Sequence, residues 1–517
     1  METGPLVSVV IPTYNRPAYL RTALASALQQ DYRNLEVLVI RDGGEEVADV
    51  VRSFDDPRIV FIDRGENRGA PFTRNEGLAQ ARGEYVCYLD DDDLYYSDHV
   101  STLVDALENE TDCQVAYTDL YRTYCRIQPD GSREVLSKVI EVSRDFDRFV
   151  MLYFNHVLLV SLMHRRDLFE KAGPYNEALT VLIDWDLTRK LCFFSDFHHV
   201  HRITGEYYCP LGCSDRVSVR GRRDADEYLR NVMTIRTTRP AKPWPKVEDV
   251  SIVLVAERLD QQVGRTLASI WRHTFYPYEV YLPLSQIDLG RLDTSMPNVV
   301  TVLVDSGAPM SARIDSVLAQ CKGEYVAIVP VGFPIGRKFW LEDSLYGLIN
   351  STGEREAFEL EGSTNELWGV VLRSDQLREA RQLFPDQSIR GSLKAAGFKI
   401  RRVRPEEIPF QFDQLLGQAQ ERQKHGHWSE AAVMFERIGA EYGNELWMCW
   451  QAAQAYFNAG QLDRASQLVG KVNRQKPSVD TLLLEAKICR RNKDFSRAIE
   501  LLESAERTLE GRELIWT

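Results

Sequence analysis

The sequence predicts a mostly parallel α/β fold that occurs twice in the chain, followed by a domain built only of helical repeats. Three observations predict it. Short apolar strands alternate with helices over the first 240 residues, and the same order returns after residue 247. Beyond residue 412 the chain is nearly free of proline, and apolar positions recur there at 34 and then 33 residues.

The composition is that of a folded soluble protein. The 517 residues are 44% hydrophobic and 27% charged, which is ordinary for globular chains. A net charge of −13 argues against a nucleic-acid partner, because binding to phosphate backbones needs basic surface. No run of about 18 apolar residues is present, so we expect no transmembrane segment. The nine cysteines form no CxxC pair, and the N-terminus lacks a basic leader, which favours a cytoplasmic location.

The first two regions are similar in sequence. VSVVIPTYNRPAYLRTALASALQQDYRNLEVLV, from Val7, aligns without gaps on VSIVLVAERLDQQVGRTLASIWRHTFYPYEVYL, from Val250. The tetrapeptide GEYV begins at Gly83 and again at Gly323. Alternating strands and helices predict a parallel sheet covered by helices. We therefore expect domains at 1–240 and 247–409, joined by the proline-rich stretch RPAKPWPKVED.

The third region, 412–512, has the pattern of stacked helix pairs. Ala431, Ala465 and Ala498 each follow a large apolar residue by three positions and precede another by four. Small and large apolar residues at this period let antiparallel helices approach closely. The pattern resembles three tetratricopeptide repeats, with Pro477 where that family often carries proline. A generic helical bundle remains the alternative.

Acidic residues follow the strand predicted at 85–89. Asp90, Asp91, Asp92 and Asp93 lie at its carboxyl end, where ligands bind in open α/β sheets. Four neighbouring carboxylates need a countercharge, and Mg²⁺ or Mn²⁺ supplies one. Carboxylates that hold such a cation next to a nucleotide suggest that the cation binds the diphosphate of that nucleotide. Asp42 and Tyr14 follow two further predicted strands, so we expect all of these residues to line one cleft.

These segments together resemble family 2 glycosyltransferases with the GT-A fold, over about Pro5 to Tyr208. The resemblance is carried by the segments VSVVIPTYNRPAYLRTALASALQQ and NRGAPFTRNEGLAQARGEYVCYLDDDD, by the turn after the second strand, and by IDWDL. It implies that Pro12, Tyr14 and Asp42 hold the nucleobase of a nucleotide-sugar and that Arg74 lies against the nucleotide. UDP is the default carrier, with dTDP and GDP left open.

The resemblance also implies roles for the carboxylates. Asp90 and Asp92 fit the ends of the DxD motif of the family, with Asp91 towards the ribose and Asp92 as the ligand of Mn²⁺ or Mg²⁺. Asp184 matches the general base, although a carboxylate at a helix N-terminus is also an ordinary cap. The family commonly has Glu before this Asp, and Ile183 stands there instead. The implied reaction is a single displacement that inverts the anomeric centre.

The second region lacks these side chains. Ser285 and Glu257 align with Asp42 and Tyr14, and PVGF from Pro330 replaces the acidic run. We expect a degenerate GT-A-like domain that serves as a scaffold or acceptor platform. The repeats favour a protein or peptide acceptor, a protein partner or self-association. Two alternatives stay open: a glycosyltransferase of cell-surface polysaccharide assembly whose repeats dock it, and a non-catalytic binding scaffold.

Three histidines lie close together in the segment FHHVHRI. His199 and His201 share one face of a predicted strand, and His198 lies on the other. We interpret them as part of a half-exposed strand, with a metal site or a place in the acceptor cleft as the alternative. The QxxRW motif of processive polymerases is not evident, which favours transfer of one or a few sugars.

Overall fold

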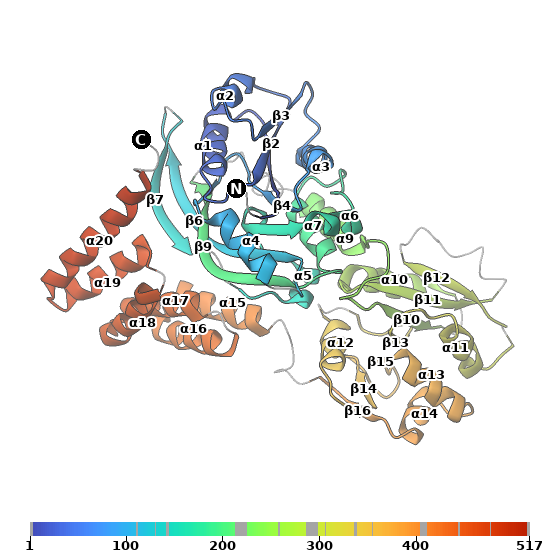
Figure 1. The fold of residues 1–517 in the computed structure, drawn as a ribbon. Helices are drawn as coiled ribbons and strands as arrows, with labels where there is room; N and C mark the ends of the chain where they lie inside the picture. The colour runs from blue at the N-terminus through green and yellow to red at the C-terminus, as the bar shows by residue number, and fades with distance from the viewer. Residues whose placement is uncertain are drawn as a thin grey trace. The chain divides into compact units, whose positions relative to one another are not determined.

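The structure is a computed structural model that divides into two compact units (Figure 1). The first unit comprises Met1–Asp147, Asn155–Tyr228 and Phe412–Thr517, and the second comprises Arg148–Phe154 and Leu229–Gln411. The described residues are 4–109, 112–129, 131–140, 144–211, 225–256, 259–285, 298–305, 307–335, 339–353, 355–403, 411–442, 445–475 and 477–513.

The first unit is built on a nine-stranded sheet (Figure 1). Its strands follow the order β3-β2-β1-β4-β8-β6-β9-β5, and β7 pairs with β6. The strands are β1 (Val7–Thr13), β2 (Leu35–Asp42), β3 (Ile59–Arg64), β4 (Tyr85–Tyr88), β5 (Leu94–Tyr95), β6 (Val115–Ile127), β7 (Arg133–Ile140), β8 (Leu162–Arg165) and β9 (Phe197–Pro210). Strands β1 to β4 are parallel, which confirms the predicted α/β sheet.

Helices cover this sheet because its central strands are apolar on both faces. The helices are α1 (Pro17–Leu28), α2 (Ala48–Arg52), α3 (Ala70–Gln80), α4 (His99–Asn109), α6 (Arg166–Ala172) and α7 (Ile183–Leu191), with a 3₁₀ turn at Leu159–Ser161. Helix α3 lies directly on β1 and β2. A Cβ atom on Gly77 would come within 2.8 Å of Val10 and 2.7 Å of Ile40, so only glycine permits this approach.

The second unit holds a seven-stranded sheet with the order β12-β11-β10-β13-β15-β14-β16. Its strands are β10 (Val250–Val255), β11 (Tyr278–Leu284), β12 (Val299–Leu303), β13 (Tyr325–Pro330), β14 (Glu356–Glu359), β15 (Val370–Arg373) and β16 (Lys399–Arg401). Its helices are α10 (Gln261–His273), α11 (Met310–Leu318), α12 (Glu342–Ile349), α13 (Ser374–Leu383) and α14 (Ile389–Ala395). Helix α9 (Ala225–Thr237) crosses the sequence boundary between the units.

The two sheets share order and register. Strands β12-β11-β10-β13-β15-β14 run in the senses of β3-β2-β1-β4-β8-β6, with β15 and β8 antiparallel to their neighbours. A hydrogen bond from a glycine N–H to a serine hydroxyl also recurs in both sheets. The Ser8 hydroxyl accepts from the Gly83 N–H at 2.8 Å, and the Ser251 hydroxyl accepts from the Gly323 N–H at 3.0 Å. The gapless sequence alignment therefore has a counterpart in the hydrogen bonds of both units.

One helix belongs to a different unit from the residues that flank it in the sequence. Helix α5 (Arg148–Tyr153) comes from the first region of the sequence but belongs to the second unit. The Phe149 ring packs against Tyr276 and Tyr346, with ring centroids 4.9 and 5.0 Å apart. A helix this short is not stable through its own hydrogen bonds, so aromatic packing of this kind stabilises it.

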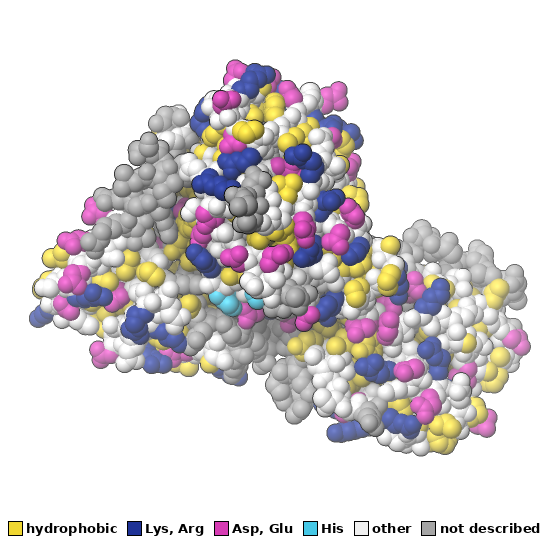
Figure 2. Space-filling view, in the orientation of Figure 1, with side chains coloured by type: hydrophobic (Ala, Val, Ile, Leu, Met, Phe, Trp, Pro, Cys, Tyr) yellow, Lys and Arg dark blue, Asp and Glu magenta, His cyan; other side chains and the backbone are white. Residues whose placement is uncertain are grey.

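Six helices follow at the end of the chain: α15 (Gln411–Lys424), α16 (Trp428–Tyr442), α17 (Glu445–Asn458), α18 (Leu462–Gln475), α19 (Val479–Arg491) and α20 (Phe495–Glu513) (Figure 1). The three repeated alanines are buried in α16, α18 and α20. No helix within the described residues combines the length and hydropathy needed to cross a bilayer. On the face shown in Figure 2, acidic and basic side chains are interspersed over both units.

Candidate active site

The predicted site residues meet at one edge of the first sheet. Strand β1 lies between β2 and β4 and runs parallel to both, so the carboxyl ends of all three strands are adjacent. Pro12 and Tyr14 belong to the end of β1 and the loop that follows it. Asp42 ends β2, and the acidic run follows β4. The structure thus brings together the residues that the sequence analysis selected from separate segments.

Arg74 connects the acidic run to the more distant Asp184. Its guanidinium donates to an Asp90 oxygen at 2.7 Å and to an Asp184 oxygen at 3.2 Å. Arg74 belongs to α3, and its side chain is buried. Burial alone would lower the pKa of Arg74, and the two carboxylates raise it above its ordinary value. Arg74 is therefore a fixed positive charge between two acids.

Asp184 lies in the first turn of α7 without capping it. The N-cap residue is Leu182, in a left-handed conformation with φ of +60°, and no side-chain cap is formed. The Asp184 carboxylate turns to Arg74, and its side chain is 43% exposed. Partial desolvation raises the pKa of Asp184, and Arg74 acts in the opposite direction. An exposed carboxylate with a raised pKa can both meet a ligand and accept a proton.

Asp186, two residues further on, has a different environment. Its carboxylate accepts from Lys190 Nζ at 2.7 Å and from the Asn176 backbone N–H at 3.0 Å. Asp186 is buried, so this acid holds α7 together and is not presented to a ligand.

The end of β1 and the loop after it contact the middle of the acidic run. Thr13 Oγ1 donates to Asp91 at 2.9 Å, and Arg16 Nη1 donates to Asp92 at 2.8 Å and to Asp91 at 3.2 Å. Burial and the neighbouring Asp92 raise the pKa of Asp91 to about 7, although Arg16 lowers it. Neither Thr13 nor Arg16 was predicted as a site residue. Thr13 is the last residue of β1, so its place at a strand end could have identified it, whereas the loop position of Arg16 gave no such signal.

Asp42 and Tyr14 differ in exposure. Asp42 is buried, and its two oxygens accept from the backbone N–H groups of Arg68 and Gly69 at 2.8 and 2.9 Å. These bonds fix the start of α3, from which Arg74 projects. Tyr14 is exposed, and Gly44 of the β2 turn lies so close that a Cβ there would clash with its ring and with Asn15. Pro12 is half-buried at the end of β1.

The charges at this edge suit a divalent cation. Asp90, Asp91, Asp92 and Asp184 face two guanidinium groups, which leaves two negative charges when all four acids are ionised. The Asp90 and Asp92 side chains are 32% and 15% exposed, so their oxygens can reach a ligand. Carboxylate oxygens of this kind fit Mg²⁺ or Mn²⁺. Asp93 is buried instead and accepts from the Tyr208 N–H at 2.9 Å.

Comparison with known proteins identifies this region. The family model described as Glycosyl transferase family 2 matches residues 8–156, which contain the three strand ends and the acidic run. Residues 8–156 form a family 2 glycosyltransferase domain. The match ends before Asp184, which lies outside the residues that the family model covers.

Relatives of this domain occur in several bacteria. An uncharacterized glycosyltransferase of Rickettsia prowazekii is 30% identical over 212 residues, 39% of this chain and 63% of its own. The GalNAc(5)-diNAcBac-PP-undecaprenol beta-1,3-glucosyltransferase of Campylobacter jejuni is 34% identical over 159 residues, 29% of this chain and 49% of its own. The chain thus spans less than two thirds of these relatives. The crystal structure of S. aureus TarS 1-349 in complex with UDP-GlcNAc is 19% identical, with a TM-score of 0.36, over 45% of this chain and 66% of that one.

Proposed function

We propose that the chain transfers a sugar from a nucleotide-sugar, a UDP-sugar by default, to an acceptor and inverts the anomeric centre. One observation carries the proposal: Arg74 links Asp90 of the acidic run to the exposed Asp184. A donor-side acid and a candidate base are thereby held at opposite ends of one guanidinium group.

The donor would lie along the ends of β1, β2 and β4. The exposed Tyr14 ring, Pro12 and Asp42 would hold the base. Asp91 would face the ribose. Asp92, with Asp90 beside it, would hold Mg²⁺ or Mn²⁺, which when bound offsets the charge of a departing diphosphate. Arg16 already contacts both Asp91 and Asp92, so it would lie next to that diphosphate.

Asp184 would act on the acceptor side. Its carboxylate would take the proton of an acceptor hydroxyl as that oxygen attacks the anomeric carbon. Attack from the face opposite the nucleotide gives inversion in a single step. Arg74 would hold the Asp184 carboxylate at a set distance from the donor, and a positioned base of this kind contributes roughly 10² to 10⁴ to the rate.

The second unit is proposed to be a degenerate copy that serves as a scaffold or acceptor platform. Support comes from the shared strand order and from one turn. The Asp93 N–H donates to the Asp90 carbonyl at 3.1 Å, and the Phe333 N–H donates to the Pro330 carbonyl at the same distance. The turn is kept, but its side chains are apolar and cannot hold a cation.

The acceptor is proposed to be a protein or peptide, held by tetratricopeptide-like repeats in a cytoplasmic enzyme. Support comes from three equivalent helix turns at Gly426, Gly460 and Lys493, each closed by the same pair of backbone hydrogen bonds. A glycan acceptor in polysaccharide assembly is the second candidate. The name of the C. jejuni relative, a glucosyltransferase of an undecaprenol-linked glycan, favours it.

The proposal is tested with the full chain and a panel of nucleotide-sugars, with and without Mn²⁺. A bound donor at 100 times its Kd should stabilise the protein by about 2.7 kcal/mol, seen as a rise in Tm. Slow release of free sugar should also depend on Mn²⁺. Asp92→Asn should abolish both effects, while Asp49→Asn, an exposed acid on α2, should change neither. Donor binding without sugar release in any condition would indicate a non-catalytic scaffold instead.

A further inference from the structure

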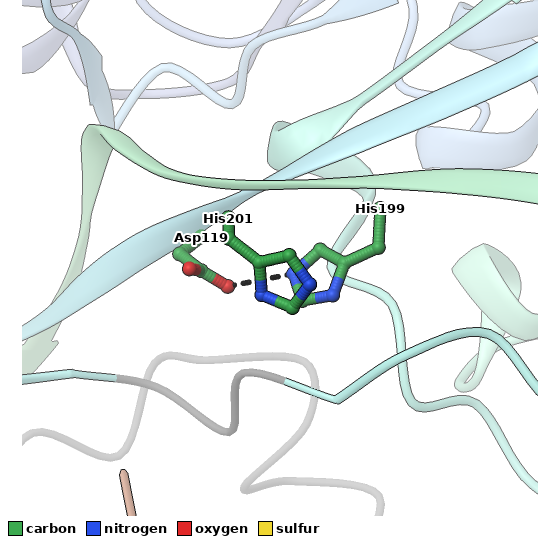
Figure 3. Close-up of side chains that lie close together, drawn as sticks. All are labelled: Asp119, His199 and His201. Carbon is green, nitrogen blue, oxygen red and sulfur yellow. Dashed lines mark hydrogen bonds and ion pairs between the residues drawn. The ribbon is translucent and has the colours of Figure 1, made fainter. Parts of the chain in front are cut away.

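Figure 3 shows a second group of side chains that could hold a metal ion, Asp119, His199 and His201. Asp119 comes from β6, and His199 and His201 come from the adjacent β9. One ligand atom from each of the three lies within 4.8 Å of the other two. His199 Nε2 is 2.9 Å from an Asp119 oxygen, and the rings of His199 and His201 are 4.1 Å apart between centroids.

A local irregularity of the sheet brings these residues together. Along the β6–β9 pair, Thr118 lies opposite Val200, but the next residue, Asp119, lies opposite Ile203. Two residues of β9, including His201, are therefore extra. Such bulges re-aim side chains and occur often next to functional sites. Alternation along β9 already places His201 beside His199, and the two extra residues bring it near Asp119 as well.

The His199 ring is held from three sides. The Tyr117 ring stacks on it, with centroids 4.5 Å apart and an interplanar angle of 1°. Its Nε2 faces Asp119, and its Nδ1 lies 2.8 Å from an oxygen of Asp145. The side chains of His199 and Asp119 are both almost fully buried. The ring orientation is thus fixed before any ligand arrives.

Both nitrogens of His199 face a carboxylate, an arrangement that either an imidazolium or a bound cation satisfies, and the third ligand atom nearby, from His201, favours the cation. A neutral imidazole carries one N–H and can donate to only one of the two carboxylates. When Nδ1–H donates to Asp145, the Nε2 lone pair and the Asp119 carboxylate face each other. A cation between them satisfies both. In metal sites a carboxylate commonly accepts from the histidine nitrogen that does not bind the metal, and it thereby fixes the orientation of the ring.

We propose that Asp119, His199 and His201 bind a first-row transition cation such as Zn²⁺. Asp145, whose Oδ1 lies 2.8 Å from His199 Nδ1 and 3.0 Å from His201 Nε2, orients both rings. Two imidazole nitrogens and one carboxylate select Zn²⁺, Co²⁺ or Ni²⁺ over Mg²⁺, which prefers oxygen alone. Three protein ligands leave a fourth position open for water or a ligand. His201 is 54% exposed, so the cation can enter from solvent.

This site is distinct from the one proposed at the acidic run. Strands β4 and β6 are both antiparallel to β8, which lies between them, so they run in the same direction. Asp119 lies within β6 and Asp90 follows the end of β4, and β8 separates these two strands in the sheet. The inference does not rest on the proposed transfer reaction, because none of its residues belongs to the donor or base side.

Co²⁺ is the probe for the test, because its visible d–d absorption reports tetrahedral nitrogen and oxygen ligands. The full-length protein carries Asp92→Asn, which disables the acidic run, and is stripped of metal with a chelator before titration. We expect one Co²⁺ per chain, displaced by one Zn²⁺. His201→Asn should weaken binding at least 10-fold. Asp145→Asn should weaken it by about 10- to 100-fold, because the carboxylate that orients the ligating rings is lost.

His198→Asn is the matched control, since it removes a histidine from the opposite face of the same strand. It should leave Co²⁺ affinity unchanged. His201 is exposed, so its variant should keep the parent Tm. The proposal is overturned if the Asp92→Asn protein binds no Co²⁺, if His201→Asn binds as tightly as its parent, or if a thiolate-to-cobalt charge-transfer band places the ion on cysteine.

Discussion

Arg74 donates a hydrogen bond to Asp184 at 3.2 Å, although 110 residues separate the two in the chain. The same guanidinium donates to Asp90 at 2.7 Å. A planar guanidinium presents its N–H groups in a fixed fork, so the two carboxylates are held at a set separation. A lysine, as a compact point charge, would keep the charge and lose that separation.

The first prediction is that Arg74→Lys keeps the positive charge beside Asp90 but no longer holds the Asp184 carboxylate in position. The ammonium group should stay near Asp90 and leave Asp184 without a fixed partner. We expect transfer to fall at least 10-fold, while Mn²⁺-dependent donor binding changes by less than 3-fold. Single-turnover kinetics and calorimetry measure the two effects. Arg74→Met removes both contacts and should lower Tm only modestly, because the Asp90 and Asp184 side chains that lose their partner are 32% and 43% exposed to water. Unchanged transfer in Arg74→Lys would contradict the positioning role.

The second prediction contrasts the two acids of α7. Asp184→Asn should keep donor affinity and lower transfer by roughly 10²- to 10⁴-fold, because an amide cannot accept the proton. Asp186→Asn should do the reverse. It breaks the buried contact with Lys190 and should lower Tm while donor binding and transfer per folded molecule persist. Loss of donor affinity in Asp184→Asn would place that residue on the donor side.

The third prediction concerns the pH dependence of stability in the second unit. Glu342 is fully buried and accepts from the Phe275 and Tyr276 N–H groups at 2.7 and 3.3 Å. Burial raises the pKa of Glu342 to about 7, although these N–H groups lower it. In the unfolded chain the pKa is about 4.3. The folded state therefore binds more protons between about pH 4.3 and 7, so the stability that Glu342 contributes falls as pH rises through that range.

Glu342→Gln removes this titration and keeps an oxygen that can accept from both N–H groups. The variant should match the wild type near pH 4 and exceed its Tm by several degrees near pH 8, since 1 kcal/mol changes Tm by about 2–4 °C in domains of this size. Scanning calorimetry across that range gives the difference. A Tm difference that is the same at every pH would contradict the buried-acid explanation.

Much of the first sheet follows from the sequence alone. Residues at the ends of three parallel strands converge because the strands are parallel, and this was enough to group Tyr14, Asp42 and Asp90. Arg16 could not be assigned in the same way. It lies in a loop, and only the path of that loop shows that its guanidinium reaches Asp91 and Asp92.

Two other features depend on tertiary structure. The sequence places helix α5 within the first region, but aromatic packing around Phe149 assigns it to the second unit. The histidine group depends on the two extra residues opposite Asp119 in β9. Strand periodicity predicts that His199 and His201 share a face, which is correct, but it carries no signal for a bulge or for the approach of Asp119.

The last prediction concerns the helical repeats. Each of three helices, α15, α17 and α19, ends in the same turn, in which one residue is left-handed. The residue is Gly426 with φ of +80°, Gly460 with φ of +79°, and Lys493 with φ of +63°. The pair of hydrogen bonds that closes each turn is also the same. The Lys493 N–H donates to Arg490, and the next N–H donates to Cys489, as in a Schellman motif.

Lysine is the residue out of place in this set, because a side chain costs roughly 1–2 kcal/mol in the left-handed region and glycine does not. Lys493→Gly should therefore stabilise the α19–α20 pair by up to about 1 kcal/mol, after the greater freedom of glycine in the unfolded chain is subtracted. Gly460→Lys should destabilise the repeats by a similar amount, although a Cβ at Gly460 meets no atom within 4 Å. Lys487→Gly, inside α19, is the control and should destabilise by about 1 kcal/mol. Amide hydrogen exchange in α19 and α20 measures each effect, and slower exchange in Lys493→Gly is the expected result. Faster exchange would mean that the Lys493 side chain stabilises the α19–α20 pair by more than the left-handed backbone at Lys493 destabilises it.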